Sequence, residues 1–208
     1  MASILKFGRT FLQEIFKKKN LRLIYVGRLV KWKGVDLLLE ACSIVIQKVE
    51  FELEIVGEGE YRNDLELLAA ELKISDRVRF SGWLTQLQCA QRMAESDIFI
   101  LPSLYECGGA VILEAMAMKL PVIATKWGGP TDYLDDNCGI LIEPDSQEIF
   151  VKKIAQSIVK LSKSYELRHL MGEKGHQKVI NEFDWRKKVE RMSQIYQNLI
   201  LLSTSADG

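Results

Sequence analysis

The sequence predicts an α/β fold in which one parallel sheet of about six strands is covered by helices on both faces. Three observations support this prediction. Short apolar segments recur along the chain, amphipathic helical segments alternate with them, and glycine-rich turns follow several of the apolar segments. Strands buried on both faces are nearly continuous in apolar residues, and parallel neighbours need a crossover between them. The pattern therefore predicts a doubly wound, Rossmann-like sheet that binds ligands at the carboxyl ends of its strands.

The strand signals have similar lengths and spacing. The clearest is the apolar run at residues 97–101, which suits the interior of a covered sheet. The predicted strands are residues 22–26, 51–56, 78–81, 97–101, 121–124 and 139–142.

Amphipathic helical segments separate these strands. Thr85 opens one helix, with Gln88 completing a capping box. The other predicted helices are residues 34–47, 64–72, a segment starting at 108–109, and then 146–161, 165–182 and 185–202. We therefore divide the chain into a basic amphipathic helix or linker at 1–20, one domain with a C-terminal crossover helix at 21–202, and a disordered tail at 203–208.

The composition is that of a soluble globular protein with one well-buried domain. Hydrophobic residues make up 48% of the 208 residues, and 28 basic residues balance 28 acidic ones. No overall positive field therefore indicates nucleic acid as a partner. Four widely spaced cysteines without a C-x-x-C pair predict reduced thiols and a cytoplasmic location. No metal site is expected, because the two histidines lie far from the cysteines.

The first residues form a separate segment. No apolar run reaches the ~20 residues of a membrane span, and the tripartite pattern of a signal peptide is absent. Residues 4–20 nevertheless combine apolar and basic residues in the pattern of an amphipathic helix. Two alternatives follow, peripheral contact with a membrane and packing against the domain, and we favour packing.

The most informative motif runs from Glu106 to Glu114 and reads Glu-Cys-Gly-Gly-Ala-Val-Ile-Leu-Glu. It lies where a predicted strand gives way to a helix, so Gly108 and Gly109 fall at the helix start. Glycine lets a ligand approach the backbone, and the free N–H groups and dipole of a helix start favour an anion such as a diphosphate. Carboxylates accept hydrogen bonds from sugar hydroxyls. Although an arbitrary pair of glutamates is usually solvated, this arrangement predicts that Glu106 and Glu114 bind two different parts of one extended ligand.

A second motif follows the first predicted strand and reads Gly-Arg-Leu-Val-Lys-Trp-Lys-Gly from Gly27 to Gly34. Arg28 offers a planar fork of donors and Lys33 a point charge. Together they can neutralise a diphosphate and stabilise it as it leaves. Alone the motif is weak, because basic residues near a strand end are usually solvated.

Together the two motifs resemble the signatures of retaining GT-B glycosyltransferases of the family-4 type. Residues 101–125 resemble the segment that carries the paired carboxylates of that family, and the Gly-Arg-x5-Gly pattern is similar to the start of its C-terminal domain. The turns at residues 56–59, 78–83 and 128–130 and the closing segment from Phe183 agree with this. The resemblance covers about residues 21–200 and implies one half of a GT-B fold.

The resemblance also implies a role for each matching residue. Arg28 and Lys33 would hold the donor diphosphate, Glu106 and the backbone of residues 108–110 the sugar, and Glu114 the ribose. Arg28, Lys33 and Glu106 are therefore the catalytic candidates. For the base pocket the candidates are Gly57, Trp83 and Leu84, with core packing as an even alternative for Trp83. The other donor-site candidates adjoin these motifs and are Gly27, Cys107, Gly108, Gly109, Ala110 and Val111.

The sequence departs from the family pattern at two of these positions. Lys119 stands where the family more often has glycine, and Cys107 replaces a different small or aromatic residue, which bears on sugar selectivity. The Gly57-Glu58-Gly59 turn matches the first two glycines of the G-x-G-x-x-G motif of NAD-binding proteins. The third glycine is missing, because Arg62 occupies its position. NAD binding is therefore disfavoured.

The activity that the resemblance implies is transfer of a sugar from a nucleotide diphosphate sugar to an acceptor hydroxyl, with retention and without a metal or other cofactor. The acceptor-binding N-terminal domain is expected as a partner in cis or as a separate chain. We expect the chain alone to bind donor without efficient transfer. The alternatives are a non-catalytic nucleotide-sugar-binding module, a subunit of a split glycosyltransferase, and a related GT-B epimerase or phosphorylase.

Overall fold

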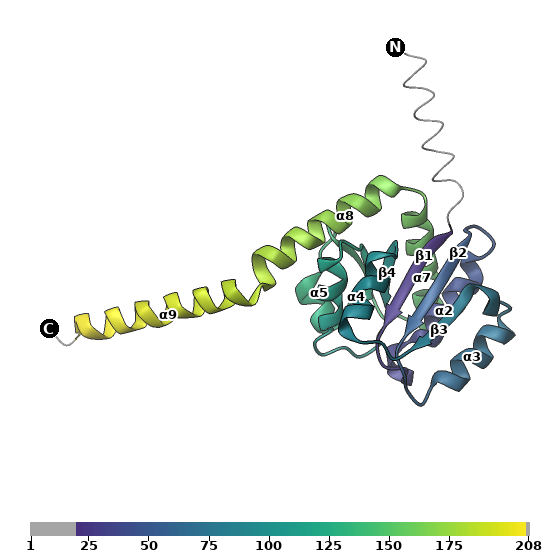
Figure 1. Ribbon diagram of the computed structural model, residues 1–208, viewed down its shortest axis with the longest axis horizontal. Coiled ribbons are helices and arrows are strands. Elements are labelled where there is room, and N and C mark those ends of the chain that lie inside the picture. Colours follow the sequence, from purple (N-terminus) through teal and green to yellow (C-terminus); the bar gives the residue numbers. More distant parts are fainter. Residues whose placement is uncertain (1–19, 207–208) are drawn as a thin grey trace, which may run out of the picture.

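A computed structural model describes residues 20–206 of the chain. Six parallel strands form one sheet in the order β3-β2-β1-β4-β5-β6 (Figure 1). The strands are β1 (Leu21–Val26), β2 (Phe51–Val56), β3 (Val78–Gly82), β4 (Ile98–Leu101), β5 (Val122–Thr125) and β6 (Gly139–Ile142). All six predicted strands are thus confirmed, with ends that differ by one residue at most.

Helices follow the strands and cover the two faces of the sheet. The order of the strands reverses direction after β3, so right-handed crossovers put α2 and α3 on one face and α4 and α5 on the other. α7 returns to the first face and packs against α2, while α8 packs against α5. The helices are α2 (Val35–Val45), α3 (Arg62–Glu71), α4 (Gln86–Ala94), α5 (Ala110–Ala117), α6 (Gly129–Tyr133), α7 (Gln147–Ser162), α8 (Tyr165–Lys178) and α9 (Trp185–Ala206).

The core lies where the sheet is covered on both sides. Every residue of β4 and β5 is buried, as the continuous apolar runs of these strands require. The 3-10 turns η1 (Lys31–Lys33) and η2 (Ser75–Arg77) were not predicted, nor was the five-residue α6, because its Gly-Pro sequence also suits a turn. The capping box of Thr85 and Gln88 is present as predicted.

The C-terminal segment leaves the sheet as a long helix. α8 ends at Lys178, one π turn (η3, Val179–Phe183) follows, and α9 then extends away from the rest of the molecule (Figure 1). α9 exposes a stripe of apolar side chains at Trp185, Val189, Met192, Ile195 and Tyr196. Residues 203–206, expected in the tail, are helical, and residues 207–208 lie outside the described part.

The predicted N-terminal helix or linker at residues 1–20 lies outside the described residues except for Asn20, so the structure does not choose between its two alternatives. No helix among residues 20–206 has the length and apolar character needed to cross a membrane.

Candidate functional site

The turns at the carboxyl ends of the strands are locked together by glycines. A Cβ atom on Gly57 would lie 1.9 Å from the carbonyl oxygen of Gly27, and one on Gly128 would lie 2.1 Å from that of Glu106. A Cβ atom on Gly34 would likewise lie 2.3 Å from the carbonyl oxygen of Pro102. Such contacts leave no room for a side chain. The turns that follow β1, β2, β4 and β5 therefore form one packed backbone layer at this edge.

Gly108 differs from these glycines. In the described part of the chain, no heavy atom outside its chain neighbours lies within 4 Å of the position that its Cβ would take. Packing therefore does not explain a glycine here. It precedes Gly109, whose φ of +64° begins α5, so the open space lies at the start of a helix. A ligand could approach the backbone at this point, as the sequence motif predicts.

Lys33 and Glu106 meet beside this helix start. Lys33 Nζ lies 2.5 Å from Glu106 Oε2, and the N–H of Gly109 donates to Glu106 Oε1 over 3.1 Å. Their side chains are 18% and 11% exposed, so this ion pair is largely shielded from water. The sequence analysis assigned them to different parts of the ligand, and the direct contact between them was missed because they are 73 residues apart.

The free N–H groups expected at the start of α5 are only partly available. The N–H of Gly109 donates to Glu106, so the expectation that this group is unpaired was wrong. Ala110 and Val111 have no hydrogen-bond acceptor for their N–H groups within residues 20–206. These two donors, together with the helix dipole, remain able to bind an anion.

Arg28 lies exposed on the turn after β1, and its guanidinium has no ion pair among the described residues. Tyr25 stabilises this turn, because its hydroxyl donates to the carbonyl oxygen of Arg28 over 2.9 Å. Burial raises the pKa of the Tyr25 hydroxyl, and the negative charge of Glu106 raises it further. Tyr25 is a residue that the sequence analysis missed, and its signal was a phenol in an otherwise apolar strand.

Glu114 lies in α5 and faces α4. Gln86 Nε2 donates to its Oε1 over 3.3 Å. The nearby Cys89 has a raised pKa, first because it is buried and second because of the charge of Glu114. Trp83, at the carboxyl end of β3, is 72% exposed, so it does not pack in the core. The adjacent Leu84 is half-buried and packs against the core.

Two exposed aromatic residues adjoin the same turns. Tyr105 precedes Glu106, Trp127 precedes Gly128, and their rings meet edge to face with centroids 5.9 Å apart. This pair was not predicted from the sequence, because its members belong to different turns. Cys107 is exposed between Glu106 and Gly108, whereas the other three cysteines are buried. Among the described residues, no cluster of three histidine, cysteine or carboxylate side chains could hold a metal.

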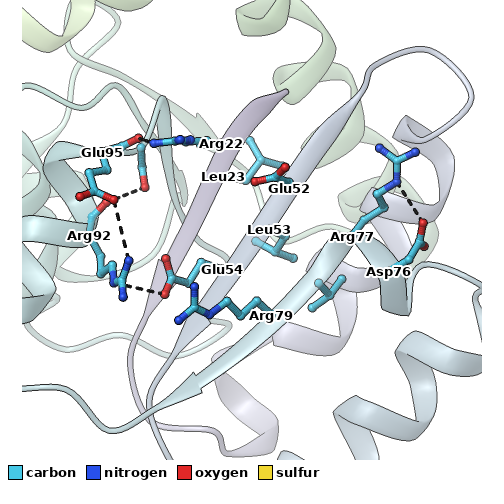
Figure 2. A pocket seen from close by; sticks show the side chains of 12 residues that line it. Arg22, Leu23, Glu52, Leu53, Glu54, Asp76, Arg77, Arg79, Arg92 and Glu95 are labelled. Atoms are coloured by element: carbon cyan, nitrogen blue, oxygen red, sulfur yellow. Dashed lines mark hydrogen bonds and ion pairs between the residues drawn. The ribbon is translucent and has the colours of Figure 1, made fainter. Parts of the chain in front are cut away.

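A second polar region lies away from these residues. It is a hollow of about 330 Å³ beside the amino-terminal parts of β1, β2 and β3 (Figure 2). Its acidic and basic side chains are interspersed: Arg92 contacts Glu54 at 3.7 Å and Glu95 at 3.8 Å. In the strand register Arg22 lies beside Glu52, and Glu54 lies beside Arg79. Much of this charge is balanced within the protein, which is typical of a solvated part of a sheet that helices cover only in part. We call this region of β1, β2 and β3 the open face.

Comparison with known proteins agrees with the motifs. A family model described as "Glycosyl transferases group 1" matches residues 9–178. The lipopolysaccharide core biosynthesis glycosyltransferase LpsE of Rhizobium meliloti is 35% identical over 159 residues, covering 76% of this chain and 44% of that protein. A GDP-mannose-dependent monoacylated alpha-(1-6)-phosphatidylinositol monomannoside mannosyltransferase of Corynebacterium glutamicum is 31% identical, covering 83% of this chain and 46% of that protein.

The fold agrees as well. The structure of sucrose-phosphate synthase from Thermosynechococcus elongatus superposes with a TM-score of 0.76 at 28% identity, covering 88% of this chain and 46% of that one. The chain thus spans about half the length of the curated relatives it matches. The related solved structures are GT-B glycosyltransferases, and the six-stranded sheet corresponds to one half of that fold. The chain belongs to the group 1 glycosyl transferase family.

Proposed function

We propose that the chain is the donor-binding domain of a retaining, GT4-type glycosyltransferase, which transfers a sugar from a nucleotide diphosphate sugar to an acceptor hydroxyl. One observation carries the proposal. The Lys33–Glu106 pair, the unpaired amides of Ala110 and Val111, and the open space at Gly108 occur together at the start of α5. A cation, free backbone donors and a carboxylate acceptor are the groups that a sugar diphosphate needs.

The diphosphate would bind between Arg28, Lys33 and the start of α5. Lys33 has three N–H donors, so it can keep Glu106 as one partner and still donate to a phosphate oxygen. Arg28 has no competing ion pair among the described residues, so its guanidinium can donate two parallel hydrogen bonds to the diphosphate. These groups would stabilise the charge that grows on the diphosphate as the bond to the sugar breaks.

The two carboxylates would orient the rest of the donor. Glu106 is fixed by Lys33 and by the Gly109 N–H, so its oxygens keep a defined position for the sugar hydroxyls. Within residues 20–206, Glu114 accepts one long side-chain hydrogen bond, from Gln86, which the paired hydroxyls of a ribose can replace. The exposed ring of Trp83 would stack on the base, beside Gly57 and Leu84. No metal or other cofactor takes part in this proposal, and the acceptor attacks from the face that the diphosphate leaves.

The acceptor would be bound by a second, N-terminal domain, in the same polypeptide or in another. The relatives are about twice the length that the chain covers, which supports this partner. The Corynebacterium relative is named as GDP-mannose-dependent, which supports a nucleotide-sugar donor. The apolar stripe of α9 would pack on that second domain. We propose a cytoplasmic location with peripheral membrane contact.

Calorimetric titration of the chain with UDP, GDP and ADP sugars tests donor binding. We expect one class of donor to bind, and Glu114→Ala to weaken it roughly tenfold, because one set of charge-assisted hydrogen bonds to the ribose is lost. Glu52→Ala, which removes an exposed carboxylate from the open sheet face, serves as the matched control and should bind like the unaltered chain. Equal weakening in both variants, or no binding by any donor, would contradict the proposal.

Transfer is tested by adding an N-terminal acceptor domain. We expect little sugar transfer by the chain alone and measurable transfer after the two parts are joined, because the acceptor site forms between them. Efficient transfer by the chain alone would overturn the assignment of the acceptor site. Donor binding without transfer by the joined protein would instead identify a non-catalytic nucleotide-sugar module.

A further inference from the structure

α2 and α7 pack side by side and leave a hollow of about 430 Å³ between their C-terminal halves. Among the described side chains around it, four are lysines and none is a carboxylate. Apolar side chains lie between these cations. We call this region the lysine hollow and define it by Lys48, Lys152, Lys160 and Lys163 with Ile44 and Val159.

Most of the positive charge in the lysine hollow is uncompensated. Lys152 Nζ contacts Glu148 Oε1 at 2.5 Å, but Lys48, Lys160 and Lys163 form no ion pair within residues 20–206. This differs from the hollow in Figure 2, where acidic side chains accompany the arginines. An anionic partner would therefore meet three exposed ammonium groups without first displacing an internal carboxylate.

The same groove becomes acidic toward the carboxyl edge of the sheet. Glu40 and Glu148 line that end, and both are already bonded, Glu40 by Gln147 at 3.0 Å and Glu148 by Lys152. Ile44 lies between the two ends and is 42% exposed. The cationic end therefore combines unpaired lysines with exposed apolar surface, a combination that suits the interface of a membrane.

The chain enters β1 at the same edge. The N–H of Leu21 donates to the carbonyl oxygen of Glu50 over 3.0 Å, two residues after Lys48. Asn20, the first described residue, therefore lies at the edge that carries Lys48. In the sequence, Asn20 is preceded directly by Lys17, Lys18 and Lys19.

We propose that the lysine hollow docks the domain on an anionic membrane surface, with lipid phosphates against the lysines and Ile44 at the headgroup boundary. Each lysine near such a surface contributes favourably, and clusters of four to eight basic residues are typical of such docking segments. The exposed side chain of Ile44 among the unpaired lysines favours a membrane over an acidic protein partner, because apolar surface next to cations suits the headgroup boundary. This docking does not depend on donor binding.

Co-sedimentation of the full chain with lipid vesicles tests the proposal. Vesicles of phosphatidylcholine alone are compared with vesicles that also contain phosphatidylglycerol, at low and at high salt. We expect binding only to the anionic vesicles and less of it at high salt. Lys160→Gln with Lys163→Gln should lower the partition coefficient about thirtyfold, from the usual contribution of two lysines at an anionic surface.

The matched control is Lys174→Gln with Lys187→Gln, which removes the same charge from exposed positions in α8 and α9. We expect it to bind like the unaltered chain, and Lys48→Gln with Lys160→Gln to repeat the loss in a second combination. Thermal unfolding of each variant shows that it is folded. Equal losses in hollow and control variants, binding to neutral vesicles, or no vesicle binding at all would overturn the proposal, and the last result would favour an acidic protein as the occupant.

Discussion

The open face of β1, β2 and β3 and the carboxyl edge of the same sheet both carry several charged groups, but the two regions differ in how these groups are arranged. On the open face, Glu54 contacts Arg92 and lies beside Arg79 in the strand register, so opposite charges lie close together within the protein (Figure 2). The hydroxyl of Ser81 also donates to Glu54. At the carboxyl edge, Arg28 has no ion pair among the described residues, and α5 begins with unpaired amides.

This difference shows that a density of charge does not identify a binding site. The open face resembles a solvated surface. Cross-strand charge pairs keep the exposed part of the sheet soluble and hinder pairing of the edge strand β3 with another chain. The carboxyl edge instead combines tightly packed glycine turns with one glycine, Gly108, at which an added Cβ would meet no described atom within 4 Å. Unpaired donors next to unfilled space indicate a ligand more strongly than charge does.

The largest expected effect separates the two kinds of glycine at the carboxyl edge. Gly128 has a φ of +61°, and a Cβ there would lie 2.1 Å from the carbonyl oxygen of Glu106. We expect Gly128→Ala to lower the free energy of unfolding by about 3 kcal/mol, from backbone strain and a steric clash. Gly108→Ala should leave it within about 0.5 kcal/mol but weaken donor binding. Denaturant unfolding and calorimetry measure the two effects.

A large loss of stability in Gly108→Ala would break this comparison, because Gly108 would then serve the fold like its neighbours. Unchanged donor affinity in a stable Gly108→Ala variant would equally remove the reason to place a ligand beside its backbone.

A second prediction compares one arginine from each region. Arg28→Ala should raise the donor Kd roughly thirtyfold, because about 2 kcal/mol of charge-assisted hydrogen bonding to the diphosphate is lost. Arg79→Ala removes the same charge from the open face and should leave the Kd unchanged. Calorimetry with the donor that binds the unaltered chain measures both. Similar losses would mean that the net charge, rather than the position of Arg28, controls affinity.

The smallest expected effect concerns the ion pair of Lys178 and Asp135, which contributes to folding stability and not to donor binding. Lys178 Nζ donates to Asp135 Oδ2 over 2.7 Å and, with the Asn137 N–H, holds the pKa of Asp135 below its ordinary value of 3.8. A lowered pKa stabilises the folded state above the ordinary pKa, and this contribution is lost as the pH falls through the folded pKa.

Lys178→Met should therefore cost about 0.5 kcal/mol at neutral pH, since the pair is partly exposed. The difference from the unaltered chain should vanish once Asp135 is protonated in both. Urea unfolding at several pH values measures it, with the donor Kd as the control that should not change. A difference that persists in strong acid would show that lost packing of the Lys178 stem, rather than the ion pair, accounts for the effect.

The sequence was sufficient for most of the fold, because its strands are short apolar runs between glycine turns and amphipathic helices. It did not predict α6 or the π turn at Val179–Phe183, where the residues suit turn and helix about equally. The end of α9 at Ala206 was also missed, since a polar tail gives no stop signal of its own.

The candidate site was predicted as a set of residues but not as an arrangement. Motif spacing placed Glu106, Glu114, Arg28 and Lys33 at one edge of the sheet. The contact of Lys33 with Glu106 depends on how two distant turns pack, which no local pattern records. Likewise, the exposure of Trp83 is decided by tertiary packing, and sequence reasoning left it as an even choice.

The most direct test of the central claim is an amide NMR spectrum of the chain titrated with the UDP, GDP and ADP sugars in turn. We expect one donor to shift the amide signals of Gly108, Ala110 and Val111 most strongly and to leave those of Glu52 and Arg79 nearly unchanged. Shifts confined to the open face, or no shift with any donor, would contradict the assignment of the carboxyl edge as the donor site.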